Sequence, residues 1–169
     1  EAFEENIGRF LSEYGMQSFP EMGTIMKFAE EKDLDINSKV MKERQKASLG
    51  TGNLIKYIED YFSPQTDFRS IVVLSQIMQA FAIKSAVEIH RRSKPFCMGT
   101  LYWQFNDCWP AISWSSIDYF GNWKALHYHA KRFFNEIIIV IHEKEERMHI
   151  SVINDKHKKV DLRIQLQLS

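Results

Sequence analysis

The feature that most constrains this fold is an uninterrupted helix-forming run of 25 residues, 68–92, which contains neither proline nor glycine. Thr66 or Asp67 before it is a good N-cap, because the side-chain oxygen of either residue accepts a hydrogen bond from a free backbone N–H of the first turn. Arg91 and Arg92 suit the C-terminal end of the helix dipole, and Pro95 forces the helix to stop. The apolar residues spread over more than one stripe, so we expect neighbouring elements on two sides of this helix.

Two apolar segments flank the long helix. We read residues 6–12 as a strand that ends near Ser12, and residues 96–105 as a continuous apolar strand of the kind that parallel sheets bury on both faces. A strand, a long helix and another strand make a βαβ unit, which indicates an α/β fold. We also expect helices over residues 35–45, 53–62 and 123–134, with a glycine-containing loop over 48–53.

The hydrophobic period changes near Asn135. Beyond it we expect three strands, over residues 137–142, 147–154 and 160–168. In the last of them apolar and polar side chains alternate, which is typical of a half-buried strand in an antiparallel sheet. A boundary near Asn135 therefore separates an α/β part from an all-β part. Because the alternation still runs at the last residue, Ser169, we expect this second domain to be incomplete.

Charge and cysteine content narrow the function classes. The chain carries 22 Lys and Arg against 22 Asp and Glu, so its formal net charge is zero. The basic excess that drives binding to nucleic acid or to an anionic membrane is missing, and we expect neither partner. No run of about 18 apolar residues is free of charge, which argues against a membrane span. Cys97 and Cys108 fit none of the spacings of zinc sites.

A carboxylate and a group of aromatic and polar residues follow the two predicted strands. Glu13 comes directly after the first strand, where an α/β barrel carries its chemistry, and is a candidate nucleophile or acid; a solvated glutamate is the commoner role at such a position. Trp103 and Trp109 lie at and beyond the end of the second strand. Aromatic faces pack on sugar rings while amides and carboxylates bind hydroxyls, so this rim suits a carbohydrate. Core packing is the alternative, which we favour for Trp114 and Trp123.

Three blocks of the sequence carry a family resemblance. They read RFLSEYGMQSFP over residues 9–20, GTLYWQFNDCWP over residues 99–110 and SWSSIDYFGNWKALHY over residues 113–128. In this order they closely resemble the β-mannosidases of glycoside hydrolase family 2. The resemblance extends over about residues 9–134 and more loosely into the strands beyond. One departure is Arg44-Gln45-Lys46, where many relatives have His-Gln-Lys.

The resemblance implies a fold and a set of site residues. Residues 1–134 would form the C-terminal part of a TIM (β/α)₈ barrel, and residues 135–169 the start of an immunoglobulin-like β-sandwich, present as an incomplete antiparallel segment. Glu13 matches the catalytic nucleophile at the end of the seventh strand, and Trp103 matches the tryptophan that lines the pocket for the terminal sugar. The same motif supplies supporting substrate-binding residues, namely Gln104, Asn106, Asp107 and Trp109. No cofactor and no metal is implied.

The implied reaction is the removal of terminal β-D-mannosyl residues from oligosaccharides or glycans by double displacement. Glu13 attacks the anomeric carbon, while a second carboxylic acid about 5–5.5 Å away protonates the leaving oxygen and then activates water. By resemblance this acid belongs to an Asn-Glu motif on the fourth barrel strand, upstream of the present sequence. We therefore expect the isolated chain to be inactive.

Two further interpretations stay open on the sequence. One is another family 2 glycosidase, such as a β-galactosidase, β-glucuronidase or exo-glucosaminidase, although the loop after Trp103 resembles the mannosidase version more. The other is a non-catalytic piece with a structural or sugar-binding role. Because part of a barrel exposes sheet edges, we expect such a piece to form a homodimer or to repack. The resemblance leaves the compartment open, since bacterial relatives are often periplasmic and animal ones lysosomal.

Overall fold

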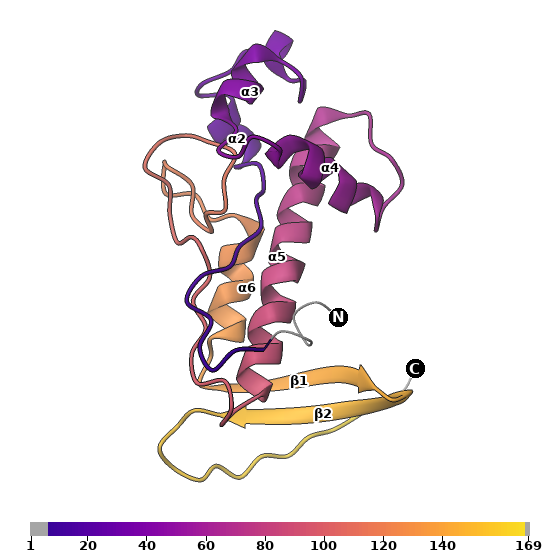
Figure 1. The fold of residues 1–169 in the computed structure, drawn as a ribbon, viewed down its shortest axis with the longest axis vertical. Helices are drawn as coiled ribbons and strands as arrows, with labels where there is room; N and C mark the ends of the chain where they lie inside the picture. Colours follow the sequence, from indigo (N-terminus) through magenta and orange to yellow (C-terminus); the bar gives the residue numbers. More distant parts are fainter. Residues whose placement is uncertain (1–6, 168–169) are drawn as a thin grey trace.

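The computed structural model describes residues 7–167 and is organised around one long helix, α5 (Phe68–Arg92). Figure 1 shows α5 as the axis of the molecule, with smaller helices at one end and a β-hairpin across the other. Its limits are those predicted. The Asp67 carboxylate accepts a hydrogen bond from the Ser70 backbone N–H at 2.9 Å, and the helix ends at Arg92 with Ser93 as its C-cap.

α5 is covered on two sides, as its broad apolar surface predicts. In its first half Ile71 and Val72 pack into a core built by the helices at that end of the molecule. In its second half Ile83 and Val87 pack against Leu126. α5 also has the length and mean hydropathy of a membrane-crossing helix, and these two cores account for its apolar character within the fold. The helices around it are α2 (Met22–Ile25), α3 (Lys39–Arg44), α4 (Gly50–Glu59) and α6 (Ala125–Phe133).

The predicted short helices are present with shifted limits. Residues 35–45 are helical over α3 alone, which follows the 3₁₀ turn η1 (Glu31–Asp33). α4 begins at Gly50, inside the segment predicted to be a loop. A Cβ atom at this glycine would lie 2.3 Å from Oε1 of Gln17, so Gly50 permits close packing in the first turn of a helix. Sequence pattern alone does not distinguish that use of glycine from a loop.

The two strands predicted on either side of α5 are reduced to a short parallel pairing. The Met98 N–H donates to Arg9 O at 2.9 Å, and Leu11 donates to Gly99 O at 2.9 Å and accepts from the Leu101 N–H at 2.8 Å. The bridge between Leu11 and Thr100 is isolated, so continuous strands over 6–12 and 96–105 were a wrong expectation for the described residues, and Asn6 lies outside them. The second segment leaves the first after Trp103, because the backbones of Gln104 and Phe105 hydrogen-bond to residues 114–117 instead.

An antiparallel hairpin follows the last helix. β1 (Ile137–Lys144) pairs with β2 (Arg147–Asn154) in a register that runs from Ile137 opposite Asn154 to Lys144 opposite Arg147. The turn residues Glu145 and Glu146 have φ values of 52° and 59°, as a two-residue type I′ turn requires. The first two of the three strands predicted beyond Asn135, over residues 137–142 and 147–154, are thus confirmed. The boundary near Asn135 stays a prediction, and α6 ends before it while β1 begins after it.

The prediction of a third strand over residues 160–168 is wrong for the residues that the structure describes. Residues 160–167 are in no strand, and Leu168 lies outside the described part. Alternation indicates which side chains a strand would bury. The strand itself forms only where its backbone N–H and C=O groups pair with a neighbouring edge, and β1 and β2 pair with each other alone within residues 7–167.

A buried arginine attaches the hairpin to the helices. Arg91, 5% exposed on its side chain, donates to the carbonyl of Phe133 and, at 2.8 Å, to that of Asn135. The same guanidinium pairs with Asp155 at 2.9 Å, and Lys94 contacts the other oxygen of this carboxylate at 2.5 Å. The C-terminal ends of α5 and α6 and the end of β2 therefore meet at one charged cluster (Figure 1).

Replacing Asp155 by alanine is expected to lower the free energy of unfolding by about 1–2 kcal/mol at neutral pH, because the buried Arg91 loses a carboxylate partner. Burial opposes the charge of Asp155, but the hydrogen bond from Lys94 and the charges of Arg91 and Lys94 outweigh it, so the pKa of Asp155 lies below its ordinary value. A carboxyl with a lowered folded-state pKa stabilises the protein above its unfolded-state pKa, and this contribution is lost as the pH falls.

Chemical denaturation at several pH values measures the Asp155 effect. The difference between wild type and Asp155→Ala should shrink as the pH is lowered through about 4 and disappear below the folded-state pKa. Asp161→Ala, at an exposed carboxylate, is the matched control and should change little at any pH. A difference that persists undiminished in acid would contradict the ion-pair explanation.

Candidate functional site

The structure brings Glu13 and Trp103 onto adjacent segments at the end of the parallel pairing. The backbone N–H of Trp103 donates to the carbonyl of Tyr14, the residue after Glu13, at 2.7 Å. Both side chains are exposed, Trp103 with 48% of its surface. Glu13 and Trp103 thus lie at the same end of two paired parallel segments, which is where parallel α/β proteins place ligands.

Gly15 is required where these two segments meet. A Cβ atom on Gly15 would lie 2.2 Å from the carbonyl oxygen of Trp103 and 3.1 Å from Cδ1 of Trp114. A backbone carbonyl cannot turn aside as the end of a flexible side chain can, so glycine is the residue that fits. This contact sets the separation between the Glu13 segment and Trp103.

The substitution Gly15→Ala is expected to destabilise the protein by about 1–3 kcal/mol, because the added methyl group must push the Trp103 backbone away. Thermal unfolding measures the loss, and a changed emission spectrum of the tryptophans reports the displacement. Gly23→Ala is the matched control, since nothing lies within 4 Å of an added Cβ there and an alanine favours the helix. Equal stability of the two variants would show that the close approach is absent in solution.

A hydrogen-bonded group of Tyr14, Thr100 and His90 links the end of the parallel pairing to α5. The Tyr14 hydroxyl and Thr100 Oγ1 are 2.6 Å apart, and Nδ1 of His90 on α5 is 2.8 Å from the same Oγ1. Burial raises the pKa of Tyr14 to about 12, so its hydroxyl keeps its proton at neutral pH. Burial also lowers the pKa of His90, which favours the neutral ring. The hydrogen bonds among Tyr14, Thr100 and His90 thus join the Glu13 segment and the Trp103 segment to α5.

Two of the predicted polar residues after Trp103 make hydrogen bonds within their own loop. Gln104 Nε2 donates to the Asn106 carbonyl at 2.9 Å and to Oδ1 of Asp107 at 3.0 Å. The Asp107 carboxylate is buried and also accepts the hydroxyl hydrogen bonds of Ser113 at 2.8 Å and Ser115 at 2.6 Å. Asp107 is therefore directed into the loop, whereas Asn106 is exposed. Their assignment to substrate binding stays a prediction.

Trp109 packs against the segment that departs from the family pattern. The guanidinium of Arg44 lies 4.8 Å and the ammonium of Lys46 4.9 Å from the centre of the Trp109 ring. Arg44 also donates to the carbonyl of Pro110 at 3.1 Å. Cation–π contacts thus link the loop after Trp103 to the end of α3, and the role of Trp109 in substrate binding stays a prediction.

Lys124 ties the two site segments together from inside. Its side chain is fully buried, and its Nζ donates to the carbonyls of Ser18 at 3.3 Å and Ser113 at 3.2 Å. The same two residues pair through the Ser18 N–H and Ser113 O at 2.9 Å. Burial lowers the pKa of Lys124 to about 7, although Asp107, Asp118 and Glu21 oppose the shift. Lys124 therefore acts as an internal donor whose charge is held only weakly at neutral pH.

Three polar side chains of α5 that were not predicted as site residues bond to the Glu13 segment or to the first turn of α6. Gln79, which is fully buried, donates to the Met16 carbonyl at 2.9 Å and accepts from the Ser18 hydroxyl at 2.8 Å. Ser75 Oγ accepts from the Phe19 N–H and Gln76 Oε1 from the Ala125 N–H, both at 3.0 Å. The available signal was their spacing at positions i, i+1 and i+4 in an otherwise apolar helix, which puts them on one face.

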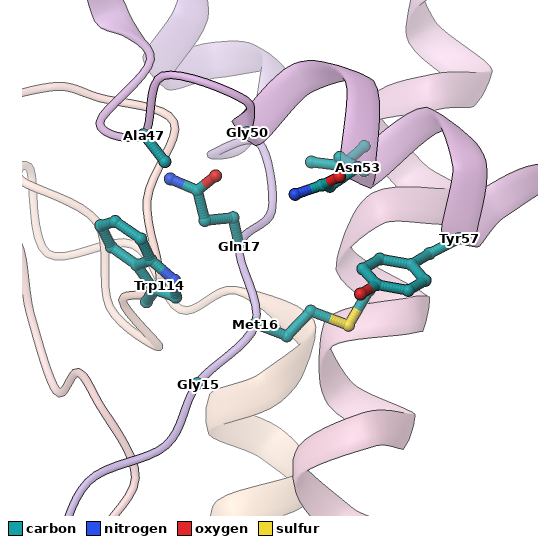
Figure 2. Close-up of a pocket in the computed structure, with 9 residues that line it drawn as sticks. Gly15, Met16, Gln17, Ala47, Gly50, Asn53, Tyr57 and Trp114 are labelled. Atoms are coloured by element: carbon teal, nitrogen blue, oxygen red, sulfur yellow. The ribbon is translucent and has the colours of Figure 1, made fainter. Parts of the chain in front are cut away.

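A cavity of about 220 Å³ opens next to Gly15, between the Glu13 segment and α4. Figure 2 shows side chains from α4, from the Glu13 segment and from the loop after Trp103 converging on it. Trp114 was expected to pack in the core, and none of the other lining residues was predicted to belong to a site. The lining residues are Gly15, Met16, Gln17, Ala47, Gly50, Asn53, Leu54, Tyr57 and Trp114.

Metal-binding chemistry has no visible basis in the described part of the chain. Residues 7–167 contain no group of three or more His, Cys, Asp or Glu side chains placed to hold an ion. Cys97 is buried and Cys108 is exposed, and both are free thiols.

Comparison with curated proteins relates most of the chain to one kind of glycosidase. It is 37% identical over 163 residues to the β-mannosidase of Mus musculus, an alignment that covers 89% of this chain and 18% of that protein. It is also 37% identical over 141 residues to β-mannosidase B of Aspergillus terreus, covering 81% of this chain and 17% of that protein. The chain thus spans about a fifth of the length of these relatives. No protein-family model matches it.

Solved structures show the same relationship. The β-D-mannosidase of Dictyoglomus thermophilum superimposes with a TM-score of 0.88 at 39% identity, over 91% of this chain and 19% of that chain. The exo-chitosanase of Amycolatopsis orientalis superimposes with a TM-score of 0.71 at 18% identity, over 86% of this chain and 18% of that chain. The second likeness shows a common fold alone.

Proposed function

We propose, from the homology of this chain to one segment of the β-mannosidases over most of its length, that the protein containing it is an exo-acting β-mannosidase of glycoside hydrolase family 2. The supporting observation is 34–39% identity to curated β-mannosidases of four mammals, over 84–95% of the chain. The chain would contribute the C-terminal part of a (β/α)₈ barrel, with its short parallel pairing as two adjacent barrel strands, and then the first strands of a β-sandwich.

The proposed mechanism is double displacement with retention. The ionised carboxylate of Glu13 attacks the anomeric carbon of a terminal β-mannosyl residue, and the bond to the leaving oxygen breaks as a second carboxylic acid donates its proton. Water, deprotonated by that same group, then hydrolyses the mannosyl ester on Glu13 and restores both carboxyls. The exposure of Glu13 beside Trp103 supports this role, because the nucleophile must reach a sugar that stacks on an aromatic surface.

Trapping of the covalent intermediate tests both the activity and the nucleophile. The protein that contains this chain is incubated with a 2-deoxy-2-fluoro-β-mannosyl donor, digested, and analysed by mass spectrometry. The fluoro sugar slows hydrolysis of the intermediate, so the label is expected on the peptide that carries Glu13. The Glu13→Gln protein is the control and should take no label. A label on another carboxylate would reject the assignment.

A panel of aryl β-glycosides tests the substrate. The mannoside is expected to be hydrolysed with the highest kcat/KM, ahead of the galactoside, the glucuronide and the glucosaminide. Preference for any of the other three would replace β-mannosidase by that activity and leave the role of Glu13 intact.

A further inference from the structure

We propose that the cavity beside Gly15 is a subsite for the second sugar of the substrate, the one that carries the leaving oxygen. The proposal rests on the proposed function, because an exo-acting glycosidase removes the terminal residue and therefore meets just one sugar directly across the cleaved bond. Four lining residues carry it, namely Gln17, Asn53, Tyr57 and Trp114.

The position of the cavity fits a neighbouring subsite. Gly15 lines it and is two residues from Glu13, so part of the cavity wall lies within about 7 Å of the Glu13 Cα atom along the chain. Trp114 forms another part of the wall, and its Cδ1 packs on Gly15 at the point where the Trp103 carbonyl also does. The cavity is therefore next to the backbone segments that carry Glu13 and Trp103.

The chemistry of the lining fits a neutral ligand rich in hydroxyls. In Figure 2 the Asn53 amide and the Tyr57 ring extend from α4 toward the Met16–Gln17 segment, Trp114 lies on the other side of that segment, and the Gln17 amide is directed toward Ala47 and Gly50. Among residues 7–167 the structure gives no hydrogen-bond partner to the side chains of Asn53, Tyr57 or Trp114, whereas Gln17 is anchored to the Ile112 carbonyl at 3.4 Å. None of the lining residues carries a charge, so the site does not favour an ionic ligand.

The size of the cavity fits a single ring. Its volume of about 220 Å³ is below the range of roughly 300–1,000 Å³ that holds drug-sized ligands. One pyranose with its hydroxyl groups is of the right size, whereas an extended oligosaccharide would have to continue into solvent. The aromatic walls from Tyr57 and Trp114 supply apolar surface for the C–H face of such a ring.

The substitutions Asn53→Ala and Tyr57→Phe test the subsite without threatening the fold. Both side chains are exposed on α4, which is anchored through its buried Leu54 and Ile58. Lys56→Gln, at an exposed position between them, is the matched control. Each variant of the protein that contains this chain is assayed on β-1,4-mannobiose, whose leaving group is a sugar, and on p-nitrophenyl β-mannoside, whose leaving group is not.

Asn53→Ala and Tyr57→Phe are each expected to lower kcat/KM for mannobiose about fivefold, the effect of one lost hydrogen bond. The same variants should change kcat/KM for the nitrophenyl substrate by less than about twofold, because its leaving group makes no such bonds. Lys56→Gln should leave both values unchanged. An equal loss of kcat/KM on both substrates would show that the two residues have a structural role only. Unchanged kcat/KM on both substrates would show that the substrate does not use the cavity. Either result overturns the subsite.

A binding measurement with mannobiose distinguishes an error in the proposed subsite from an error in the proposed function. If wild type hydrolyses neither substrate, the β-mannosidase proposal fails, and titration with mannobiose followed by tryptophan fluorescence still decides about the cavity. Quenching that Asn53→Ala weakens severalfold and Lys56→Gln does not would support a sugar site. Absence of any change up to tens of millimolar mannobiose would overturn it.

Discussion

Replacement of Glu13 by glutamine is expected to abolish hydrolysis of β-mannosides by the protein that contains this chain, with kcat/KM lowered by at least about a thousandfold. Glutamine keeps the size of the side chain, but a neutral amide cannot attack the anomeric carbon, so the covalent mannosyl intermediate cannot form. Glu13 is exposed, and the substitution should therefore leave the unfolding midpoint unchanged. Initial rates on p-nitrophenyl β-mannoside measure the loss.

Chemical rescue distinguishes a nucleophile from a residue that merely positions the substrate. In Glu13→Ala the space left by the side chain admits a small anion, so added azide is expected to restore turnover of the nitrophenyl substrate and to give α-mannosyl azide. Glu30→Gln, at an exposed glutamate that pairs with Lys32, is the control and should behave as wild type. Undiminished activity of Glu13→Gln would contradict the role proposed for Glu13.

The chain on its own provides a separate test of where the acid comes from. We expect the 169-residue chain to be inactive on the nitrophenyl substrate, because the resemblance puts the proton donor upstream of it. Activity in the isolated chain that disappears with Glu13→Gln would show that a carboxyl group within these residues, or one from a second copy, completes the site.

The substitution Gln79→Leu is expected to have the largest effect on stability, a loss of about 3–5 kcal/mol in the free energy of unfolding. Leucine fills a similar volume, but it leaves the Ser18 hydroxyl and the Met16 and Ser115 carbonyls without the partner that Gln79 now supplies. Each of these groups is then buried unpaired, at a cost of about 1–3 kcal/mol, reduced where it finds another partner. Chemical denaturation of the purified protein measures the sum.

A graded control checks that hydrogen bonds, and not polarity in general, are responsible. Gln76 lies on the same face of α5 and is nearly as buried, but its side chain accepts a single hydrogen bond, from the Ala125 N–H. Gln76→Leu is therefore expected to cost about a third as much as Gln79→Leu. Equal losses for the two variants would mean that the Gln79 network does not hold the Glu13 segment.

The candidate site was only partly predictable from the sequence. Glu13 and Trp103 were identified by their places after two apolar segments and by the motif resemblance, and the structure puts their segments in contact. The residues that maintain this contact were not identified. Gln79 acts on Met16, 63 positions away, and Lys124 acts on Ser18, 106 positions away. A sequence pattern carries no record of such distant partners, and a buried lysine looks like any surface lysine until its surroundings are known.

What the sequence alone determined are the elements whose stability is local. The limits of α5 follow from an N-cap, a basic last turn and a following proline, and the two strands of the hairpin follow from the change in hydrophobic period near Asn135. Only the tertiary structure decided whether the strands predicted over residues 6–12, 96–105 and 160–168 form within the described residues, because a strand is completed by hydrogen bonds to another segment. It also decided that Gly15 and Gly50 permit close packing and that a cavity opens beside Gly15, because each of these depends on atoms brought together from distant parts of the chain.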